Sequence, residues 1–175
     1  MPLTIPPGVD ANGRRNAIFC PTDTLSVATL TGSTAVELMC YLSKGTFGFS
    51  SSTERGADDR ECTLVSAEVM GNTTYSANDL EYVWEPQDAA GTSVTNKAFN
   101  LLGPRTGGAT GFLIVRYGIL QDTALAVGQL VDKLPVTLGP QLPKAVDGNN
   151  PAEKLKITQS VVIGQGAVFG VPLVA

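Results

Sequence analysis

Apolar and polar residues alternate along much of the chain, and this two-residue period predicts β-strands. In DLEYVWE, residues 79–85, one face carries Leu80, Tyr82 and Trp84, and the opposite face carries Glu81 and Glu85. CTLVSAEVM, residues 62–70, alternates in the same way and includes Glu68. A turn beginning at Gly71–Asn72 separates the two segments, so we expect them to form neighbouring, paired strands.

GFLIVRYG, residues 111–118, is apolar on both faces except at Arg116, which predicts a central strand covered on both sides. VELMCYL, residues 36–42, fits a strand better than a short helix. Pro135 and Pro172 indicate strands at a sheet edge, and the shifted alternation at Gln159–Ser160 indicates a β-bulge. Three more segments continue the strand pattern: 129–139, 154–164 and 167–175.

One segment has a helical period instead. Thr92 or Ser93 can cap a helix, and Gly103–Pro104 ends it. The apolar positions recur at spacings of four, seven and eight residues, and they are Val94, Ala98, Leu101 and Leu102. We expect this stripe to pack on the sheet that contains residues 111–118.

Two segments lack a period. Residues 1–24 are rich in Pro, Gly and Asn, which predicts an N-terminal arm that needs a partner surface to become ordered, before a single domain over residues 25–175. Residues 45–61 are rich in Gly, Ser, Thr and charge, with Phe47 and Phe49 as the only large apolar groups, and indicate a long exposed loop or hairpin. The predicted fold is therefore mainly β, with two packed β-sheets in a sandwich or barrel-like arrangement and one flanking α-helix.

Charge and composition narrow the function. The chain has 175 residues, and 12 basic against 16 acidic residues give a net charge of −4. This sign disfavours tight binding to nucleic acid. No apolar run approaches the roughly 20 residues that cross a bilayer, and MPLTIPPGVD does not resemble a signal peptide, so we expect neither membrane insertion nor secretion by that route.

The residue types needed for catalysis are scarce. The chain has no histidine, which excludes Ser-His-Asp and Cys-His schemes and most zinc and iron sites. Three widely spaced cysteines indicate free, buried thiols rather than a disulfide framework. A hydrolase using only carboxylates would need Asp58, Asp59 and Glu61, but these acids beside Arg55 and Arg60 fit a solvated, salt-bridged tip better. We expect no enzymatic activity, no metal and no cofactor.

Several short segments then occur in a recognisable order. They are Leu80–Val83, Glu85–Asp88, Asn96–Ala98, Leu101–Leu102, a glycine-rich turn and Gly111–Gly118, with Asp59–Cys62 before them and Gly128–Gln129, Val131–Asp132, Pro135–Val136 and Lys156–Gln159 after them. Over residues 36–174 this order resembles that of the major tail tube proteins of long, non-contractile-tailed bacteriophages of the siphovirus type, particularly those of actinobacterial hosts.

The resemblance implies a structural role in the phage tail. It implies two packed sheets with a flanking helix, hexameric rings, and a stack of rings enclosing a lumen through which the genome leaves. Implied partners are further copies of the chain, the tape measure protein, the tail terminator and the distal tail protein, with assembly in the host cytoplasm. Alternatives are another ring-forming tail component, such as a tail terminator or the tube of a contractile system, and a small-ligand-binding β-barrel, for which the 6% aromatic content is low.

Two sets of residues become candidates for this role. A negative lumen would let DNA slide without tight binding, and Glu68, Glu81 and Glu85 are the candidate lumen-facing residues. The segment 45–61 is the candidate ring-stacking element, and its candidate contact residues are Phe47, Phe49, Glu54, Arg55, Asp58 and Asp59.

Overall fold

Strands dominate the computed structural model, which describes residues 13–58, 67–88, 92–146, 149–150 and 152–175. The predicted mainly β class with two sheets is confirmed, with two short α-helices where one was expected. The elements in chain order are β1 (Arg15–Cys20), α1 (Val27–Leu30), β2 (Val36–Glu37), β3 (Phe49–Asp58), β4 (Ala67–Ala77), β5 (Leu80–Val83), a 3₁₀ turn η1 (Val94–Asn96), α2 (Lys97–Leu101), β6 (Ala109–Tyr117), β7 (Leu130–Pro143), β8 (Lys156–Ile163) and β9 (Val168–Pro172).

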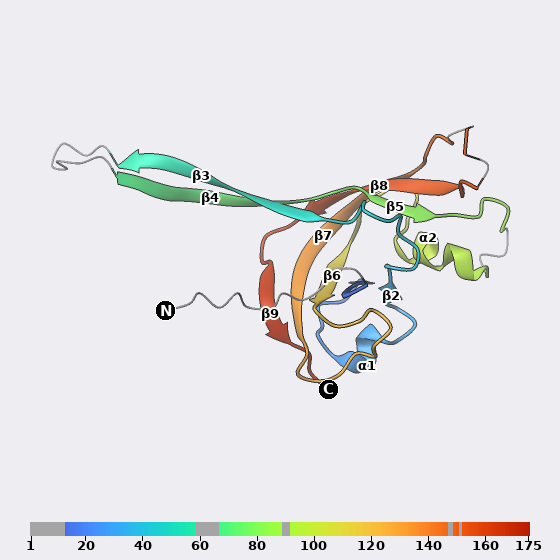
Figure 1. Ribbon diagram of the computed structural model, residues 1–175, viewed down its shortest axis with the longest axis horizontal. Coiled ribbons are helices and arrows are strands. Elements are labelled where there is room, and N and C mark those ends of the chain that lie inside the picture. Colours follow the sequence, from blue (N-terminus) through green and yellow to red (C-terminus); the bar gives the residue numbers. More distant parts are fainter. Residues whose placement is uncertain (1–12, 59–66, 89–91, 147–148, 151) are drawn as a thin grey trace, which may run out of the picture.

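Seven strands form one curled antiparallel sheet (Figure 1). Its order is β2-β1-β6-β7-β8-β5, and β9 also pairs with β7. The long strand β7 makes this possible, because its first half pairs with β6 and β9 while its second half pairs with β8. The curl brings β5 close to the segment after β2, where Leu42 bridges to Tyr82.

Strand β6 lies at the centre of this sheet, as its sequence predicts. It pairs with β1 on one side and with β7 on the other. Leu113 and Val115 belong to the larger apolar core, whereas Ile114 belongs to a smaller core that also contains Leu30 of α1 and Leu173. Both faces of β6 are therefore covered, which explains its continuous apolar run.

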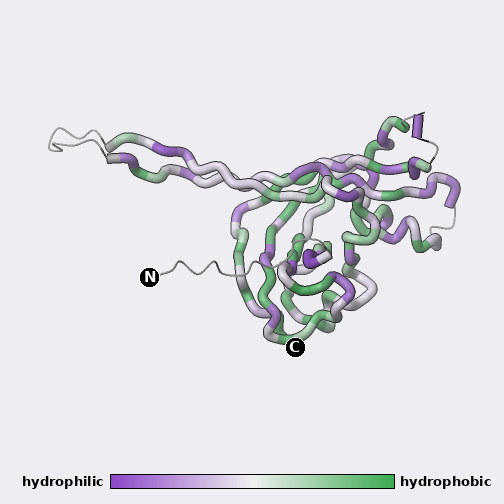
Figure 2. The backbone as a smooth tube through the Cα atoms, in the orientation of Figure 1, coloured by the Kyte–Doolittle hydropathy of each residue, from purple (hydrophilic) through white to green (hydrophobic). Residues whose placement is uncertain are grey.

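The second sheet is a two-stranded ribbon formed by β3 and β4, and it projects away from the curled sheet (Figure 1). At about 3.3 Å per residue, a ten-residue strand spans roughly 33 Å. Figure 2 shows that apolar residues concentrate in the curled sheet, while the middle of the ribbon is polar or neutral. Of the two possibilities for residues 45–61, the structure forms a hairpin over Phe49–Asp58, and residues 59–61 lie outside the described residues.

The arm prediction is wrong for residues 15–20. They form β1, which pairs along its whole length with β6, and Ala17 and Phe19 belong to the larger core. The short run AIFC is apolar on both faces because both faces are buried, so it shows no alternation. Residues 1–12 lie outside the described residues.

The helix prediction is partly correct. Ser93 caps the segment by accepting a hydrogen bond from the Thr95 amide, and Ala98 and Leu102 are fully buried in the larger core. Leu101 is half-buried, but Val94 is 78% exposed. Val94 lies in a 3₁₀ turn, whose three-residue period rotates it away from the buried stripe.

Other expectations need smaller corrections. Of residues 36–42, only Val36 and Glu37 form a strand. Pro135 is not on an edge strand, because β7 has β6 on one side and β9 and β8 on the other. It falls where β7 passes from its pairing with β9 to its pairing with β8, so its missing N–H leaves no partner unsatisfied. The bulge lies opposite Ser160, with the extra residue in β7 between Leu138 and Gln141.

Candidate assembly surfaces

The ribbon is held together by cross-strand polar pairs. Ser50 and Ser76 hydroxyls lie 2.8 Å apart, and Thr53 and Thr73 hydroxyls lie 2.9 Å apart. Arg55 Nη1 lies 3.5 Å from Glu68 Oε2, and both side chains are largely exposed. Such pairs fix the register of two strands that share no apolar core. The exposed faces of the ribbon are therefore available for contact with another molecule.

The phenylalanines expected to anchor a neighbouring subunit instead hold the base of the ribbon to its own chain. Phe47 is buried, and its ring meets the Phe49 ring edge-on with centroids 4.9 Å apart. The Arg15 guanidinium lies over the Phe47 ring and donates a hydrogen bond to the Phe47 carbonyl (2.9 Å). Phe49 is half-buried and packs against the larger core. The expectation for Phe47 is therefore wrong, because its apolar surface is already covered.

Of the four remaining candidate stacking residues, the structure describes the side chains of two. Glu54 and Arg55 are exposed on β3. Asp58 ends β3, but its side chain lies outside the described residues, as does Asp59 altogether. Their role in stacking stays a prediction.

The three candidate lumen acids do not lie together. Glu68 is on β4, which among the described residues pairs only with β3, whereas β5 pairs with β8. The expected pairing of the two neighbouring strands is therefore wrong. Glu85 follows β5 and accepts a hydrogen bond from the Ser93 hydroxyl (2.7 Å), which ties it to the start of the 3₁₀ turn. Whether any of the three faces a lumen stays a prediction.

Glu81 lies in a cluster of lysines. The Lys144 ammonium is 2.5 Å from its carboxylate, the Lys156 ammonium is 3.0 Å away, and the Ser43 hydroxyl donates at 2.8 Å. Burial alone would raise the pKa of Glu81, but the hydrogen bonds from Lys144, Ser43 and Lys156 and the charge of Lys156 lower it to about 2. The side chain is only 12% exposed, and the two lysines neutralise its charge within the subunit.

These groups surround an open hollow of about 500 Å³. We call the four lysines that line it the lysine cluster: Lys44, Lys144, Lys154 and Lys156. Sequence reasoning missed it, because Glu81, Lys144 and Lys156 come together only through the pairing of β5 with β8 and of β8 with β7.

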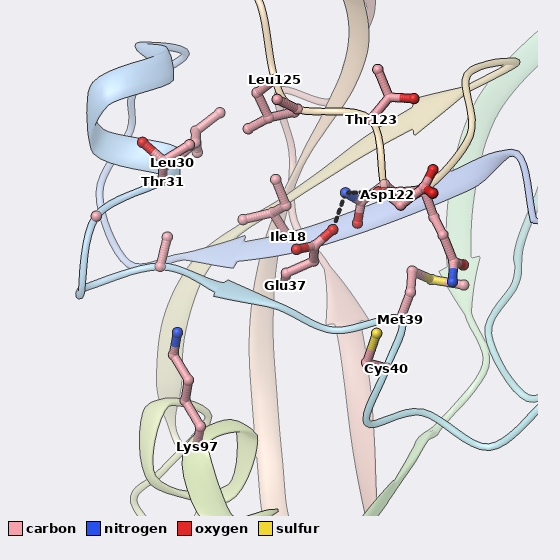
Figure 3. Close-up of a pocket in the computed structure, with 15 residues that line it drawn as sticks. Ile18, Leu30, Thr31, Glu37, Met39, Cys40, Lys97, Asp122, Thr123 and Leu125 are labelled. Carbon is pink, nitrogen blue, oxygen red and sulfur yellow. Dashed lines mark hydrogen bonds between the residues drawn. The ribbon is translucent and has the colours of Figure 1, made fainter. Parts of the chain in front are cut away.

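A second hollow, of about 390 Å³, lies between α1, β2 and the loop before β7 (Figure 3). Asn16 is buried there and donates hydrogen bonds to the Glu37 carboxylate and to the Gln121 carbonyl. Lys97 reaches toward the hollow from α2, and Cys40 lies at its rim with an exposed thiol, contrary to the expectation of buried cysteines (Figure 3).

The loop beside this hollow is organised by Arg116, which is fully buried. Its guanidinium donates to the carbonyls of Leu120, Thr123 and Ala124 and to the Gln129 side chain, at 2.7–3.2 Å. Burial lowers the pKa of Arg116, and the nearby charge of Glu37 raises it. These hydrogen bonds hold the loop in place beside the hollow.

Two classes of site are not found in the described part of the chain. No group of three or more His, Cys, Asp or Glu side chains there is placed to hold a metal ion. No described helix has the length and apolar character needed to span a membrane.

The sequence comparisons bear on the whole chain. A family model described as "Phage tail tube protein" matches residues 3–175. No curated protein sequence matches the chain. Since the family model covers essentially every residue, the chain belongs to the phage tail tube proteins, which are structural components of the phage tail.

Proposed function

We propose that this protein is the major tail tube subunit of a long, non-contractile phage tail of the siphovirus type, and that it forms stacked hexameric rings around a DNA-conducting lumen for genome ejection. The family match over residues 3–175 carries the proposal. Six subunits per ring, genome ejection and an actinobacterial host are what the resemblance of residues 36–174 implies. A tube built from subunits needs no reactive side chain, so the proposed role involves no enzymatic activity.

The edges of the curled sheet support assembly. Within the described residues, β9 pairs only with β7, so the outer edge of β9 has no strand partner. Val168 and Phe169 of β9 and the neighbouring Leu130 are large apolar residues with 40–61% exposure. An open edge with an apolar surface can add a strand of a second copy through main-chain hydrogen bonds.

The ribbon is proposed as the element that joins one ring to the next. It projects from the subunit, and its base is fixed by Phe47 and Phe49. A rigidly based, exposed ribbon loses little conformational entropy on docking. The arm prediction stays only for residues 1–12, as a segment that lies on another subunit or on the exterior of the ring.

The remaining parts of the proposal follow the family. The tape measure protein, the tail terminator and the distal tail protein are proposed partners, DNA passes without tight binding, and assembly takes place in the host cytoplasm. A different ring-forming tail component stays the second candidate, because the family match fixes the fold type and the tail but not the position along the tail.

Electron microscopy of the purified protein tests the proposal. We expect tubes of uniform diameter whose end views have six-fold symmetry. Replacing residues 54–72 by an Asn-Gly turn keeps the Thr53–Thr73 pair at the new end of a shorter hairpin. This variant should fold but give single rings or free subunits. Tubes of normal length from the shortened variant would contradict the stacking role of the ribbon, and closed single rings from the unchanged protein would favour a terminator.

A further inference from the structure

The lysine cluster has more positive charge than its own subunit neutralises. Glu81 pairs with Lys144 and Lys156, and Glu153 lies 3.8 Å from Lys156. Lys44 and Lys154 are exposed, and the ion pairs found among the described residues of this region include neither of them. Four lysines against two carboxylates leave a local charge of +2 in a chain whose net charge is −4.

The Glu81 carboxylate fixes the positions of two lysines on this surface. Glu81 holds Lys144 and Lys156 through a side chain that is 12% exposed, and Ser43 holds Glu81 from the facing segment. Two of the four ammonium groups are thereby placed before any partner arrives. A preorganised positive surface of this kind attracts a negatively charged partner and fixes its register.

The ribbon has the complementary charge. Residues 54–68 include five acidic residues and two basic residues, a net charge of −3. Glu54 and Glu68 are exposed in the described part of the ribbon, and the sequence adds Asp58, Asp59 and Glu61 between them.

The ribbon and the lysine cluster lie at opposite ends of the molecule. Figure 1 shows β3 and β4 running along the long axis in one direction, while β8 begins on the other side of the molecule. The end of β7 lies beside this start of β8, because Pro143 pairs with Ile157. Lys144 follows the end of β7, and Lys156 begins β8. The acidic ribbon of one subunit therefore points away from its own lysine cluster, and only the cluster of another copy is placed to meet it.

We propose that the lysine cluster is the docking surface for the acidic ribbon of the next copy of this chain. The contact is heterologous, because two different surfaces of the same chain meet, and such contacts propagate into rings or stacks. The inference rests on the proposed tube function and names the surface that receives the ribbon. It also replaces the expectation that Glu81 lines the lumen.

Carbodiimide cross-linking of assembled tubes tests the contact, because it joins an amine directly to a carboxylate. Mixed tubes of ¹⁴N- and ¹⁵N-labelled full-length protein distinguish links between copies from links within one copy. We expect mixed-label peptides that join Lys44, Lys144 or Lys154 to residues 54–68. The control is Lys154→Arg, which keeps the charge and should keep assembly while losing its own link. Tubes that cross-link elsewhere but never between these segments would overturn the inference.

Charge reversal gives a second test. The variant K44E/K154E should raise the protein concentration needed for assembly about tenfold or more, and adding E54K/E68K should restore at least part of the loss. Lys97→Glu reverses an exposed lysine on α2, outside the cluster, and should assemble normally. Thermal melting of each variant checks that the subunit is folded.

The outcomes separate the inference from the function it rests on. Unchanged protein that forms no tubes would contradict the proposed function. Unchanged assembly of K44E/K154E, with tubes forming in both cases, would overturn only the docking inference. Loss of binding to a short DNA duplex in that variant, with normal assembly, would reassign the cluster to phosphate and overturn the inference as well.

Discussion

Three buried polar side chains link strands that are distant in sequence. The Tyr82 hydroxyl donates to Gln159 Oε1 (2.9 Å) and accepts from Gln141 Nε2 (2.8 Å). Gln141 and Gln159 also donate to the carbonyls of Phe99 and Leu102, at 2.8 and 3.1 Å. The network therefore joins β5, β7 and β8 to the last turn of α2, whose carbonyls would otherwise be unpaired.

Removing the Tyr82 hydroxyl from this network should lower the free energy of unfolding more than removing a surface hydroxyl does. Tyr82→Phe leaves Gln159 Oε1 without its donor in a buried site, and we expect a loss of about 1–2 kcal/mol in the free energy of unfolding. Tyr75→Phe is the matched control on the ribbon and should change stability by about 0.5 kcal/mol or less. Urea denaturation of the two variants measures both values. Equal effects would mean that the network contributes no more than a surface hydroxyl.

Glu81 gives the subunit a pH dependence. Its folded-state pKa, about 2, is below the ordinary value of 4.5, so its ion pairs stabilise the fold above pH 4.5. That contribution is lost as the pH falls from about 4.5 to about 2. We expect Glu81→Gln to lower the free energy of unfolding at pH 7 by about 2 kcal/mol, a value reduced for solvent screening, and the difference from the unchanged protein to vanish near pH 2.

Denaturant titrations at pH 7, 4 and 2.5 check this prediction. Glu68→Gln serves as the control, because the ion pair of Glu68 with Arg55 is exposed. Its effect should be about 0.5 kcal/mol or less at every pH. A Glu81→Gln effect that does not depend on pH would show that the carboxylate charge is not what stabilises this site.

At the scale of elements, the helical segment separates buried from exposed apolar positions. Leu102 is fully buried beside the core strands, while Val94 is 78% exposed on the 3₁₀ turn. Leu102→Ala should cost about 2–5 kcal/mol, because it removes buried methyl groups and leaves a cavity. Val94→Ala should cost about 0.5 kcal/mol or less. Thermal or urea unfolding compares the two, and a large loss for Val94→Ala would contradict the rotation that the 3₁₀ turn produces.

The same scale shows which elements the sequence predicts. β5 is predicted because Leu80 and Tyr82 alternate with Glu81 between one core face and one polar face. β6 is predicted because a continuous apolar run of this length is typical of a strand that is buried on both faces. β1 was missed because the preceding Pro- and Gly-rich residues obscure a run of only four apolar residues, AIFC.

The ribbon and the lysine cluster mark the limit of such prediction. Both faces of β3 meet solvent over most of its length, so the segment SSSTER has no apolar alternation from which to infer a strand. Its register is set by hydroxyl pairs such as Ser50–Ser76, which do not stand out in a sequence. The lysine cluster depends on contacts across 63 residues, from Glu81 to Lys144, which only the folded sheet brings about.

At the scale of the whole molecule, the subunit has a long axis with unlike ends. One end presents an acidic ribbon and the other presents the lysine cluster (Figure 1). Such a subunit favours head-to-tail contacts and disfavours pairs that would bring two ribbons or two clusters together. This polarity fits a tube, in which every subunit has the same direction.

The charge arrangement predicts how tube assembly responds to salt. If ribbon and lysine cluster attract each other between copies, salt should weaken assembly, because the screening length falls from about 10 Å at 0.1 M to about 3 Å at 1 M. A lumen lined by like-charged rings of Glu68, Glu81 and Glu85 would have the opposite effect, since salt would relieve repulsion.

Sedimentation of tubes measures this effect. We expect the protein concentration needed for assembly to rise with added sodium chloride, and the rise to be smaller in K44E/K154E. The melting temperature of the subunit provides the control and should change little over the same range, because most of its core is apolar. Tubes that form more readily as salt increases would contradict the docking contact and favour the acidic lumen.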